Sequence, residues 1–559
     1  MSETPPLPTS QEAAPSSVSR QLLSSSAVMA VGTLFSRLTG FVRAGMLAAA
    51  IGVSAHADVF MIANTIPNSL YILVAGGVFN TVLVPQLVRA IKSDADGGDA
   101  YANRIVTLGA LVLGGVSAVL ILLAPWLLRL LVDGSYFTDP GLDAHQESLL
   151  DFARWCLPQI FLYGMFVLVG QILNARGRFG PMMWAPIANN VISVAVIGCY
   201  LAVYAGEPAV GGYTTSQELL LGLGSTIGIA AQLAILIPYL RASGFVIRPR
   251  FDFRGTGLSH TLRLGLWTVG MVIVNQLAFY VMVRRASAGS AESGGSGYTV
   301  YANAFLLTQV PHSIITVSLA TAAMPLMSRY AADHRLGDVS GELVRTLRLA
   351  LSVIVPFAAA LLVLGPALAT VLFSWGEAEG ETTALGYTLI AFAPGMVVFT
   401  LHYLALRGFY SLEDTKTPFF IQCAIAATNI ALAVVLTIVV PPEYVAPSLA
   451  VAYGASYLVG SLVSLHVLAH RLVGLARRQL LAYVARVAAA ALPAAGVAWL
   501  CVVTLGRLGL EGDDKSQALV VLAVGGIVGA FGYLALARLL HIAEIASIVR
   551  LVAARGRSV

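Results

Sequence analysis

The chain has 559 residues, of which 58% are apolar and only 11% are charged, and its mean hydropathy is +0.82. Soluble domains carry about 25% charged residues, so this composition excludes an ordinary soluble protein and predicts an all-α polytopic membrane protein. The net charge of +5 falls mainly in short segments between apolar stretches, which indicates orientation in a membrane rather than binding to nucleic acid.

The amino-terminal stretch "MSETPPLPTSQEAAPSSVSR" is rich in Pro and Ser and too polar for the apolar region of a signal peptide. We therefore predict a disordered cytoplasmic tail over residues 1–26. A membrane-spanning helix needs roughly 20 mainly apolar residues, and the chain offers fourteen such stretches. The predicted spans are 27–52, 59–88, 105–132, 149–174, 182–205, 216–240, 260–283, 298–328, 343–373, 384–410, 417–440, 446–470, 483–506 and 516–541.

The first span contains two arginines, Arg37 and Arg43, in "FSRLTGFVR". A guanidinium group deep in a bilayer is costly, and such residues usually face a cavity and mark a binding site. Snorkelling to an interface is the alternative, but both residues are far from the ends of the span. An ideal helix would place them about 120° apart. Gly40 either lets the helix bend so that they converge or allows close helix packing.

Internal similarity divides the chain into two halves. Three proline pairs recur 236 to 241 residues apart: Pro125/Pro366, Pro158/Pro394 and Pro181/Pro418. The second and eighth spans also match, each with an early and a late proline. We predict two pseudo-symmetric six-helix lobes, 27–242 and 260–472, an extra pair of helices in 483–541 and a cytoplasmic tail over 542–559. Because each lobe has an even number of spans, both lobes run in the same direction, with a cavity between them.

The early prolines of the matched spans are Pro67 and Pro311. Pro67 is expected to break its helix and free backbone carbonyls towards a cavity. Its counterpart Pro311 is flanked by Gln309 and His312, whose side chains either make ordinary interhelical hydrogen bonds or contact a substrate.

Lysine and arginine residues are distributed unequally between the two sides of the membrane in the predicted topology. With the amino terminus inside, 25 of the 33 basic residues fall on the inner side, six on the outer side and two in the first span. Cytoplasmic loops are enriched in these residues. The distribution therefore predicts fourteen spans with both termini in the cytoplasm.

Several chemistries are excluded by what the sequence lacks. None of the three lysines follows a glycine, so there is no Walker A motif and no ATP hydrolysis is expected. The four cysteines have no CxxC spacing, so neither a metal site nor a disulfide framework is indicated. We expect a transporter that is not an enzyme and has no cofactor. No carboxylate lies deep in a span, which favours coupling to the membrane potential, with a backbone or Asn-based cation site as the alternative.

Three strings resemble the MurJ (MviN) family of lipid II flippases in the multidrug/oligosaccharidyl-lipid/polysaccharide exporter superfamily. They are "FSRLTGFVRAG", "DVFMIANTIPNSLY…VPQLV" and "RGFYSLEDTKTP". The resemblance extends from about residue 24 over essentially the whole chain. It implies that the arginines of the first span line a water-filled cationic cavity and contact the diphosphate of a lipid-linked substrate.

The resemblance extends to further site residues. Asp58 resembles a family acidic residue near the cavity and either pairs with Arg43 or is a solvated loop carboxylate; Asn68 matches the family string. The fullest cationic set in the family has arginines where this chain has Tyr71 and Leu306, and an acidic residue near Ala75. Arg284 either supplies the missing charge or lies exposed in a loop.

We therefore expect a flippase that moves lipid II from the inner to the outer leaflet of the bacterial cytoplasmic membrane by alternating access. The expected partners are the undecaprenyl-diphosphate-linked substrate, the phospholipid bilayer and proteins of cell-wall synthesis or division, with no nucleic acid and a monomeric state. The alternatives are an exporter of another polyprenyl-diphosphate glycan, a drug/cation antiporter of the same superfamily and a non-transporting scaffold for wall synthesis.

Overall fold

Helices account for almost all of the computed structural model, which describes residues 17–73, 86–87, 90, 96, 98–206, 211–252, 258–292, 295–475, 477–510, 512 and 514–545. No strand occurs within these residues. The predicted all-α class is confirmed. The helices of the first half are α1 (Ser17–Ile51), α2 (Ala55–Tyr71), α4 (Asp99–Leu122), α5 (Ala124–Leu131), α6 (Asp143–Cys156), α7 (Gln159–Ala175), α8 (Gly180–Tyr204), α9 (Thr215–Glu218), α10 (Gly224–Ala234) and α11 (Leu236–Ala242).

The second half contains α12 (Leu258–Ala291), α13 (Tyr298–Pro311), α14 (Val317–Ala332), α15 (Leu336–Phe373), α16 (Thr383–Ser411), α17 (Lys416–Val439), α18 (Val445–Arg471), α19 (Arg477–Arg507) and α20 (Lys515–Leu539). Short 3-10 or π turns join several of them: η3 (Gly134–Phe137), η4 (Pro140–Leu142), η5 (Leu219–Leu223), η6 (His312–Thr316), η7 (Gly376–Ala378) and η8 (Pro442–Tyr444).

Twelve segments of the described chain are long and apolar enough to cross a membrane. They run from Asp99–Leu122 to Lys515–Leu539 and correspond one by one to the third to fourteenth predicted spans. The first predicted span corresponds to α1, and the first part of the second span, up to Tyr71, lies in α2. Residues 74–85, where the second span was predicted to continue, lie outside the described residues.

Two predicted boundaries differ from the structure. Helix α1 already begins at Ser17, so residues 17–26, predicted as tail, are helical; residues 1–16 and 546–559 lie outside the described chain. Helix α12 continues to Ala291, beyond the predicted end of its span at 283, so of the two alternatives for Arg284 the position in a loop is wrong. Apolar composition marks only the part of a helix that suits lipid, and a helix can extend beyond it.

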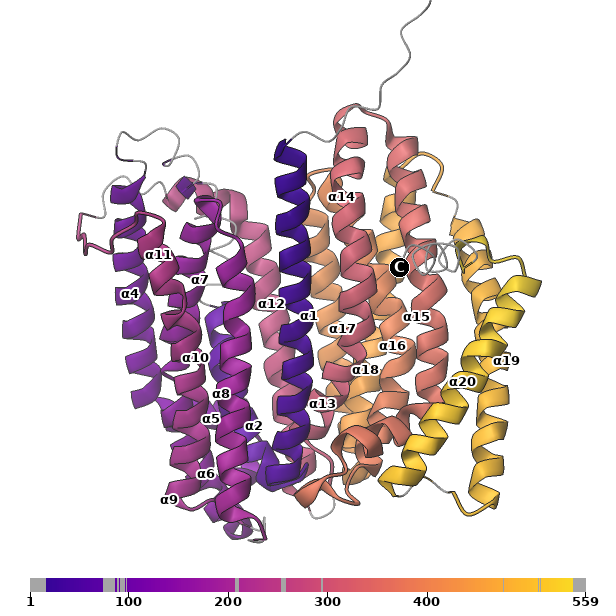
Figure 1. The fold of residues 1–559 in the computed structure, drawn as a ribbon, viewed down its shortest axis with the longest axis horizontal. Helices are drawn as coiled ribbons and strands as arrows, with labels where there is room; N and C mark the ends of the chain where they lie inside the picture. Colours follow the sequence, from indigo (N-terminus) through magenta and orange to yellow (C-terminus); the bar gives the residue numbers. More distant parts are fainter. Residues whose placement is uncertain are drawn as a thin grey trace, which may run out of the picture.

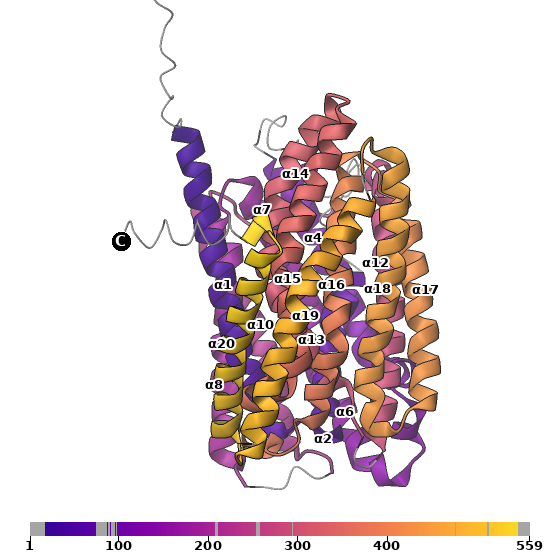
Figure 2. The same cartoon turned by 90° about the vertical axis from the view of Figure 1, so that its right-hand side faces the viewer.

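The helices form two groups with α1 between them (Figure 1). Helices α2 and α4 to α11 lie on one side, and α13 to α18 lie on the other. Helices α19 and α20 lie at the far edge and pack against α15 (Figures 1 and 2). The start of α1 and the end of α20 are both at the end of the bundle drawn uppermost in Figure 1, called here the upper end. The opposite end is called the lower end.

Small residues allow close helix contact inside the second group. Helices α16 and α18 cross at Gly395 and Gly454, where a Cβ on Gly395 would lie 3.0 Å from the Cα of Gly454. Small residues at helix crossings let backbones approach and gain van der Waals contact, which drives helix association in lipid. A larger side chain at either glycine would separate the two helices.

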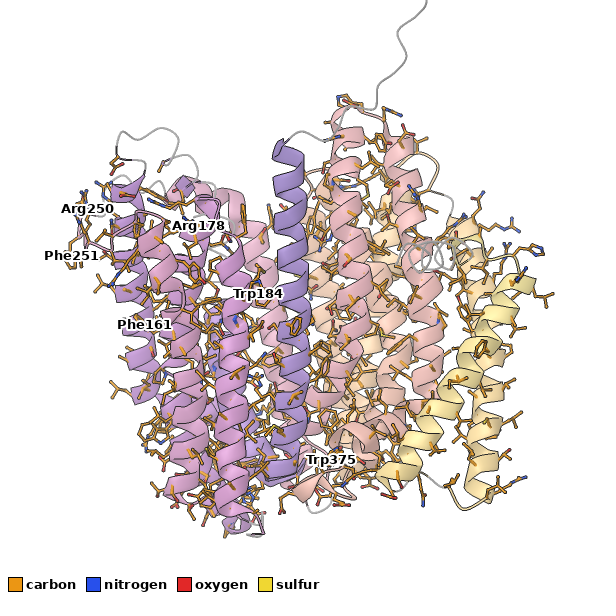
Figure 3. All side chains as sticks on the ribbon, in the orientation of Figure 1. Phe161, Arg178, Trp184, Arg250, Phe251 and Trp375 are labelled. Atoms are coloured by element: carbon orange, nitrogen blue, oxygen red, sulfur yellow. The ribbon has the colours of Figure 1, made fainter. Side chains whose placement is uncertain are left out.

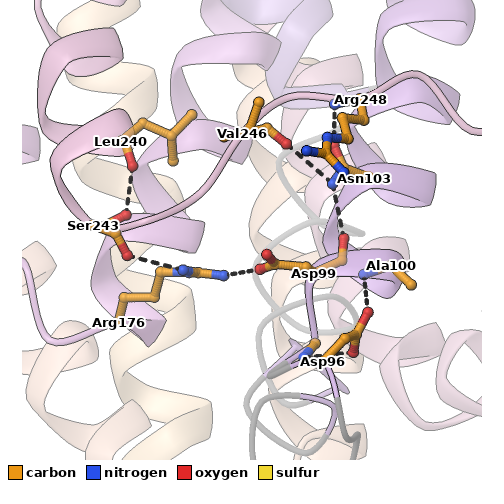
Figure 4. Close-up of polar contacts among 10 residues, drawn as sticks. Asp96, Asp99, Ala100, Asn103, Arg176, Leu240, Ser243, Val246 and Arg248 are labelled. Atoms are coloured by element: carbon orange, nitrogen blue, oxygen red, sulfur yellow. Dashed lines mark hydrogen bonds and ion pairs between the residues drawn. The ribbon is translucent and has the colours of Figure 1, made fainter.

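A network of hydrogen bonds and ion pairs stabilises the upper end of the first helix group (Figure 4). The guanidinium of Arg176 pairs with the carboxylate of Asp99 and donates to the Ser243 carbonyl at 3.0 Å. The Asn103 amide accepts from the Arg248 N–H at 2.6 Å. These contacts tie the segment after α11 to α4. The nearby Asp252 carboxylate accepts from Arg104, and this hydrogen bond lowers the pKa of Asp252.

Candidate functional site

A cavity of about 460 Å³ lies among α1, α2, α7, α8, α10 and α13. Both Arg37 and Arg43 of α1 line it, as the sequence predicts. Its other polar lining consists of amides and hydroxyls. The described lining contains no Asp, Glu or Lys. We call this space the cationic cavity.

Neither arginine forms an ion pair with a carboxylate among the described residues. The structure gives no ion pair and no hydrogen bond between Arg37 or Arg43 and another described side chain. Arg43 interacts electrostatically with Tyr163 of α7, which also lines the cationic cavity. Because an unpaired guanidinium is costly at membrane depth, the pair is available for an anionic ligand.

Gly40 lies where α1 packs against α8. A Cβ at Gly40 would lie 3.8 Å from the Asn190 amide nitrogen, and that amide donates to the Ser36 carbonyl at 2.8 Å and to Thr39 Oγ1 at 2.9 Å. Helix α1 is continuous through this point. Gly40 therefore lies at the contact between α1 and α8, and both arginines reach the cavity without a break in the helix.

Amide side chains build the wall opposite α1. Gln159 is fully buried, and its Nε2 donates to Asn64 Oδ1 at 3.2 Å, Ser225 Oγ at 3.3 Å and Thr226 Oγ1 at 3.0 Å. Asn68 of α2 also lines the cationic cavity and is exposed to it. The network holds the helices of the first group at fixed positions around the arginines.

The two matched prolines behave differently. Helix α2 runs through Pro67 to Tyr71, so the predicted break at Pro67 is wrong. Helix α13 ends at Pro311 and continues as the π-helical turn His312–Thr316 before α14. A proline removes one backbone donor, and a π turn is a usual way to absorb the mismatch. The π turn thus follows Pro311 directly. Helix α2 instead stays α-helical from Pro67 to Tyr71, before π-helical Ile72 and Leu73.

A second cavity of about 600 Å³ adjoins the first and shares Arg37 and Ala302 with it. Its lining is formed by α12, α13, α16, α17 and α18 and is rich in aromatic and amide side chains. Arg37 is the one charged residue in its described lining. We call this space the aromatic cavity.

Of the two predicted residues beside Pro311, only Gln309 is in the described lining of this second cavity. His312 is buried; its Nδ1 is 3.3 Å from Thr400 Oγ1, and its ring packs on Phe399 at a centroid distance of 4.5 Å. His312 also lies near enough to Arg37 for an electrostatic interaction. Of the two alternatives for His312, the structure contains the interhelical hydrogen bond.

Asp58 lies outside the described lining of both cavities. It is fully buried, and its carboxylate accepts from the backbone N–H of Tyr298 at 2.7 Å and of Thr299 at 2.6 Å. These are the first amides of α13, whose orphan donors a carboxylate satisfies well. Asp58 therefore joins α2 to α13 at the lower end and is neither a solvated carboxylate nor paired with Arg43. We call this contact the lower latch.

A glycine makes the lower latch possible. A Cβ at Gly297 would lie 2.1 Å from Asp58 Oδ2, which is too close for two non-bonded atoms. Further contacts surround it: Ser287 Oγ accepts from the Asp133 N–H at 2.9 Å, and Tyr136 Oη lies 3.2 Å from Ser290 Oγ. Hydrogen bonds thus join the first helix group to α12 and α13 at the lower end.

Arg284 also lies away from the cavities. Its guanidinium donates to the carbonyls of Arg129 and Leu130 at 3.2 and 3.1 Å. It does not supply the charge that resembling proteins have at the positions of Tyr71 and Leu306. Here Tyr71 packs on Tyr163 at 6.0 Å, and Leu306 lines the cationic cavity. Ala75 lies outside the described residues.

A third cavity, of about 940 Å³, lies among the loops of the lower end. Its lining includes Asp139, Glu292, Glu381 and Glu443. Burial raises the pKa of Glu381, and the neighbouring Glu377 adds to the effect. A carboxylate-lined space repels an anion, so the smaller cationic cavity is the better candidate for an anionic ligand.

Apart from Asn68 and Gln309, the cavity-lining amides were not identified from the sequence. Asn64, Gln159 and Asn190 line the cationic cavity, and Asn275, Gln422 and Asn429 line the aromatic cavity. The sequence does contain a signal for these residues, because each is an uncharged amide within a predicted apolar span. Such residues are scattered through many spans, so the sequence does not say which of them face a common space.

The chain is similar to known lipid II flippases. A family model described as "Lipid II flippase MurJ" matches residues 47–511. A probable lipid II flippase MurJ of Rhizobium meliloti is 28% identical over 72% of this chain and 73% of its own length. The lipid II flippase MurJ of Burkholderia cenocepacia is 26% identical over 69% of this chain and 72% of its own length.

Solved structures give the same fold. A lipid II flippase MurJ in an inward closed conformation superimposes with a TM-score of 0.70 at 17% identity, covering 92% of this chain and 99% of that structure. An inward-facing MATE transporter superimposes with a TM-score of 0.62 at 12% identity, covering 79% and 98%. The fold is therefore that of the multidrug/oligosaccharidyl-lipid/polysaccharide exporter superfamily. Because the family model matches most of the chain, over residues 47–511, the chain belongs to the lipid II flippase MurJ family.

Proposed function

We infer that the chain is a multi-pass flippase of the bacterial inner membrane that carries lipid II, and that Arg37 and Arg43 hold the diphosphate of this substrate. The observation that carries the assignment is the pair of unneutralised arginines in the cationic cavity. Arginine presents several donors in a planar fork that matches phosphate oxygens. Asn68, beside them in the same lining, is assigned to the headgroup as well.

We derive the transport cycle from the end of the bundle at which the two helix groups are joined. The lower latch holds the two helix groups together, and α1 carries the arginines between them. We propose that the substrate enters from the upper end, binds at the arginines and leaves after the latch breaks and the lower end opens. Gly40 and Pro311 are the proposed conformational positions, with Pro311 acting through its π turn; Pro67 is not retained.

The proposed orientation places the upper end in the cytoplasm. Arg178 and Arg250 are at the upper end, whereas Trp375 is at the lower end (Figure 3). This agrees with the enrichment of basic residues on the cytoplasmic side. Both termini would then be cytoplasmic, and the latch would face the outside.

Coupling to the membrane potential is the proposed driving force, because the described lining of the two membrane cavities holds no carboxylate. The chain is proposed to act as a monomer, with proteins of wall synthesis or division as its protein partners. A drug/cation antiporter is disfavoured because the arginines would repel a cation. A non-transporting scaffold would not need unpaired arginines inside the membrane.

The test is depletion of the protein in its own host, followed by leaflet-resolved measurement of lipid II. We expect lipid II to accumulate in the inner leaflet and to return to the outer leaflet when the wild-type chain is restored. An unchanged leaflet distribution after depletion, in a host with no second flippase, would overturn the assignment. Accumulation of a different polyprenyl-diphosphate glycan would identify the alternative substrate.

A further inference from the structure

We propose that the aromatic cavity is a glycan subsite, which receives the amino-sugar part of the substrate while Arg37 and Arg43 hold the diphosphate. This inference rests on the proposed function and adds a division of labour between the two cavities. Its volume of about 600 Å³ falls within the range of roughly 300–1,000 Å³ of small-molecule sites.

Aromatic rings supply flat apolar surface in this cavity. Phe399 packs against Tyr453 at 5.9 Å and against Tyr457 at 4.9 Å, and Tyr453 and Tyr457 lie 4.7 Å apart. Phe305, also in the lining, contacts Tyr453 at 5.6 Å. The face of an aromatic ring is electron-rich and attracts the polarised C–H groups on one face of a pyranose. The rings are fixed by one another and need little ordering when a sugar binds.

Amide groups supply the hydrogen bonds that a sugar needs. Asn275, Gln309, Gln422 and Asn429 line the same cavity. Each amide offers both donors and an acceptor, which suits hydroxyl and N-acetyl groups. Gln422 donates to Asn275 at 3.2 Å. Asn429 is half-buried and has no hydrogen-bond partner among the described residues, so a ligand would satisfy it.

The charge distribution fixes which part of the substrate goes where. Arg37 belongs to both linings, so an anion bound at Arg37 sits at the junction of the two cavities. The sugar esterified to that anion is then at the mouth of the aromatic cavity. An otherwise uncharged lining is unsuited to a second phosphate and contains no carboxylate for a metal ion. A glycan binds well where uncharged hydrogen-bonding groups surround the faces of aromatic rings, and this cavity offers both.

The experiment compares two probes on the purified full-length chain in lipid nanodiscs. The probes are undecaprenyl diphosphate, which has the tail and the anion only, and lipid II, which adds the disaccharide and peptide. The variants are Asn429→Leu and Phe399→Leu. The matched control is Phe420→Leu, because Phe420 is 54% exposed on α17 and lies outside the described lining.

Wild-type chain is expected to bind lipid II more tightly than undecaprenyl diphosphate. Each cavity variant should lose about tenfold in affinity for lipid II, on the order of one lost hydrogen bond or stacking contact, and keep its affinity for undecaprenyl diphosphate. The control should match wild type with both probes. Should Phe399→Leu fail to fold, Asn429→Leu gives the same test, because it removes an amide without a partner.

Equal losses with both probes, or no loss with either, would overturn the glycan subsite. If wild-type chain binds neither probe, the proposed function fails together with this inference. If wild-type chain binds lipid II and the variants bind it equally well, only the glycan subsite fails.

Discussion

The cationic and aromatic cavities share Arg37 and Ala302 but differ in their chemistry. The first has a second arginine and a wall of hydrogen-bonded amides around Gln159. The second has stacked aromatic rings and amides with few partners. This difference shows how one binding site can recognise charge and shape on separate surfaces. In the proposed site, the cationic cavity attracts an anion strongly but with little selectivity. The aromatic cavity beside it is proposed to bind more weakly and to select a ligand by its shape.

The difference also has an energetic side. An unpaired guanidinium in a membrane protein costs a few kcal/mol or more, whereas aromatic rings and amides cost little when they pack on one another. We therefore expect substitutions of the arginines to impair function without unfolding the chain, since a costly charge is also removed. Substitutions in the hydrogen-bonded wall should affect stability first.

The largest effect is expected at the arginines. Arg37→Ala and Arg43→Ala each remove charge-assisted hydrogen bonds worth roughly 1.5–3 kcal/mol, so each should abolish or strongly reduce growth in a flippase-depleted strain at normal membrane levels. Lysine should rescue partly, because it keeps the charge and loses the planar fork. Full growth of both alanine variants would show that the arginines are not needed for transport. The cationic cavity could then not be distinguished from the aromatic cavity as the site of the diphosphate.

The next effect concerns the lower latch, which joins α2 to α13. Asp58→Ala leaves two buried N–H groups of α13 without acceptors, at a cost of roughly 1–3 kcal/mol each. Hydrogen–deuterium exchange at Tyr298 and Thr299 should become faster. Gly297→Ala should do the same by displacing the carboxylate, whereas Gly337→Ala, which meets open space on α15, is the control. Unchanged exchange in both latch variants would rule the latch out.

A smaller effect separates the two amide sets. Gln159→Leu breaks three hydrogen bonds in the cationic wall, and Gln422→Leu breaks one in the aromatic cavity. With a net value of roughly 0.5–1.5 kcal/mol per bond, thermal unfolding should be lowered clearly more by Gln159→Leu. Equal shifts would show that the two walls are equally dependent on their amides.

The smallest effect is expected at Arg284. Arg284→Ala removes two hydrogen bonds to backbone carbonyls at the lower end and no charge from either cavity. Growth in the complementation assay should match wild type, in contrast to Arg43→Ala. A growth defect as severe as that of Arg43→Ala would show that Arg284 belongs to the substrate path.

The sequence predicted the helices and the arginine pair because both depend on local composition: apolar length marks a span, and a charge inside it marks a cavity. It did not predict the role of Asp58, whose partners are backbone amides 240 and 241 residues away. Backbone donors leave no trace in residue identity. Arg284 was misplaced because α12 continues past its apolar part, and the break expected at Pro67 was wrong because α2 continues through it.

The most direct measurement of the central claim is the affinity of the purified full-length chain for undecaprenyl diphosphate, compared among wild type, Arg43→Ala, Arg43→Lys and the matched variant Arg284→Ala. We predict a loss of about tenfold or more for Arg43→Ala, a smaller loss for Arg43→Lys and no change for Arg284→Ala. Equal affinity of Arg43→Ala and wild type for this probe would contradict the assignment of the cationic cavity as the diphosphate site.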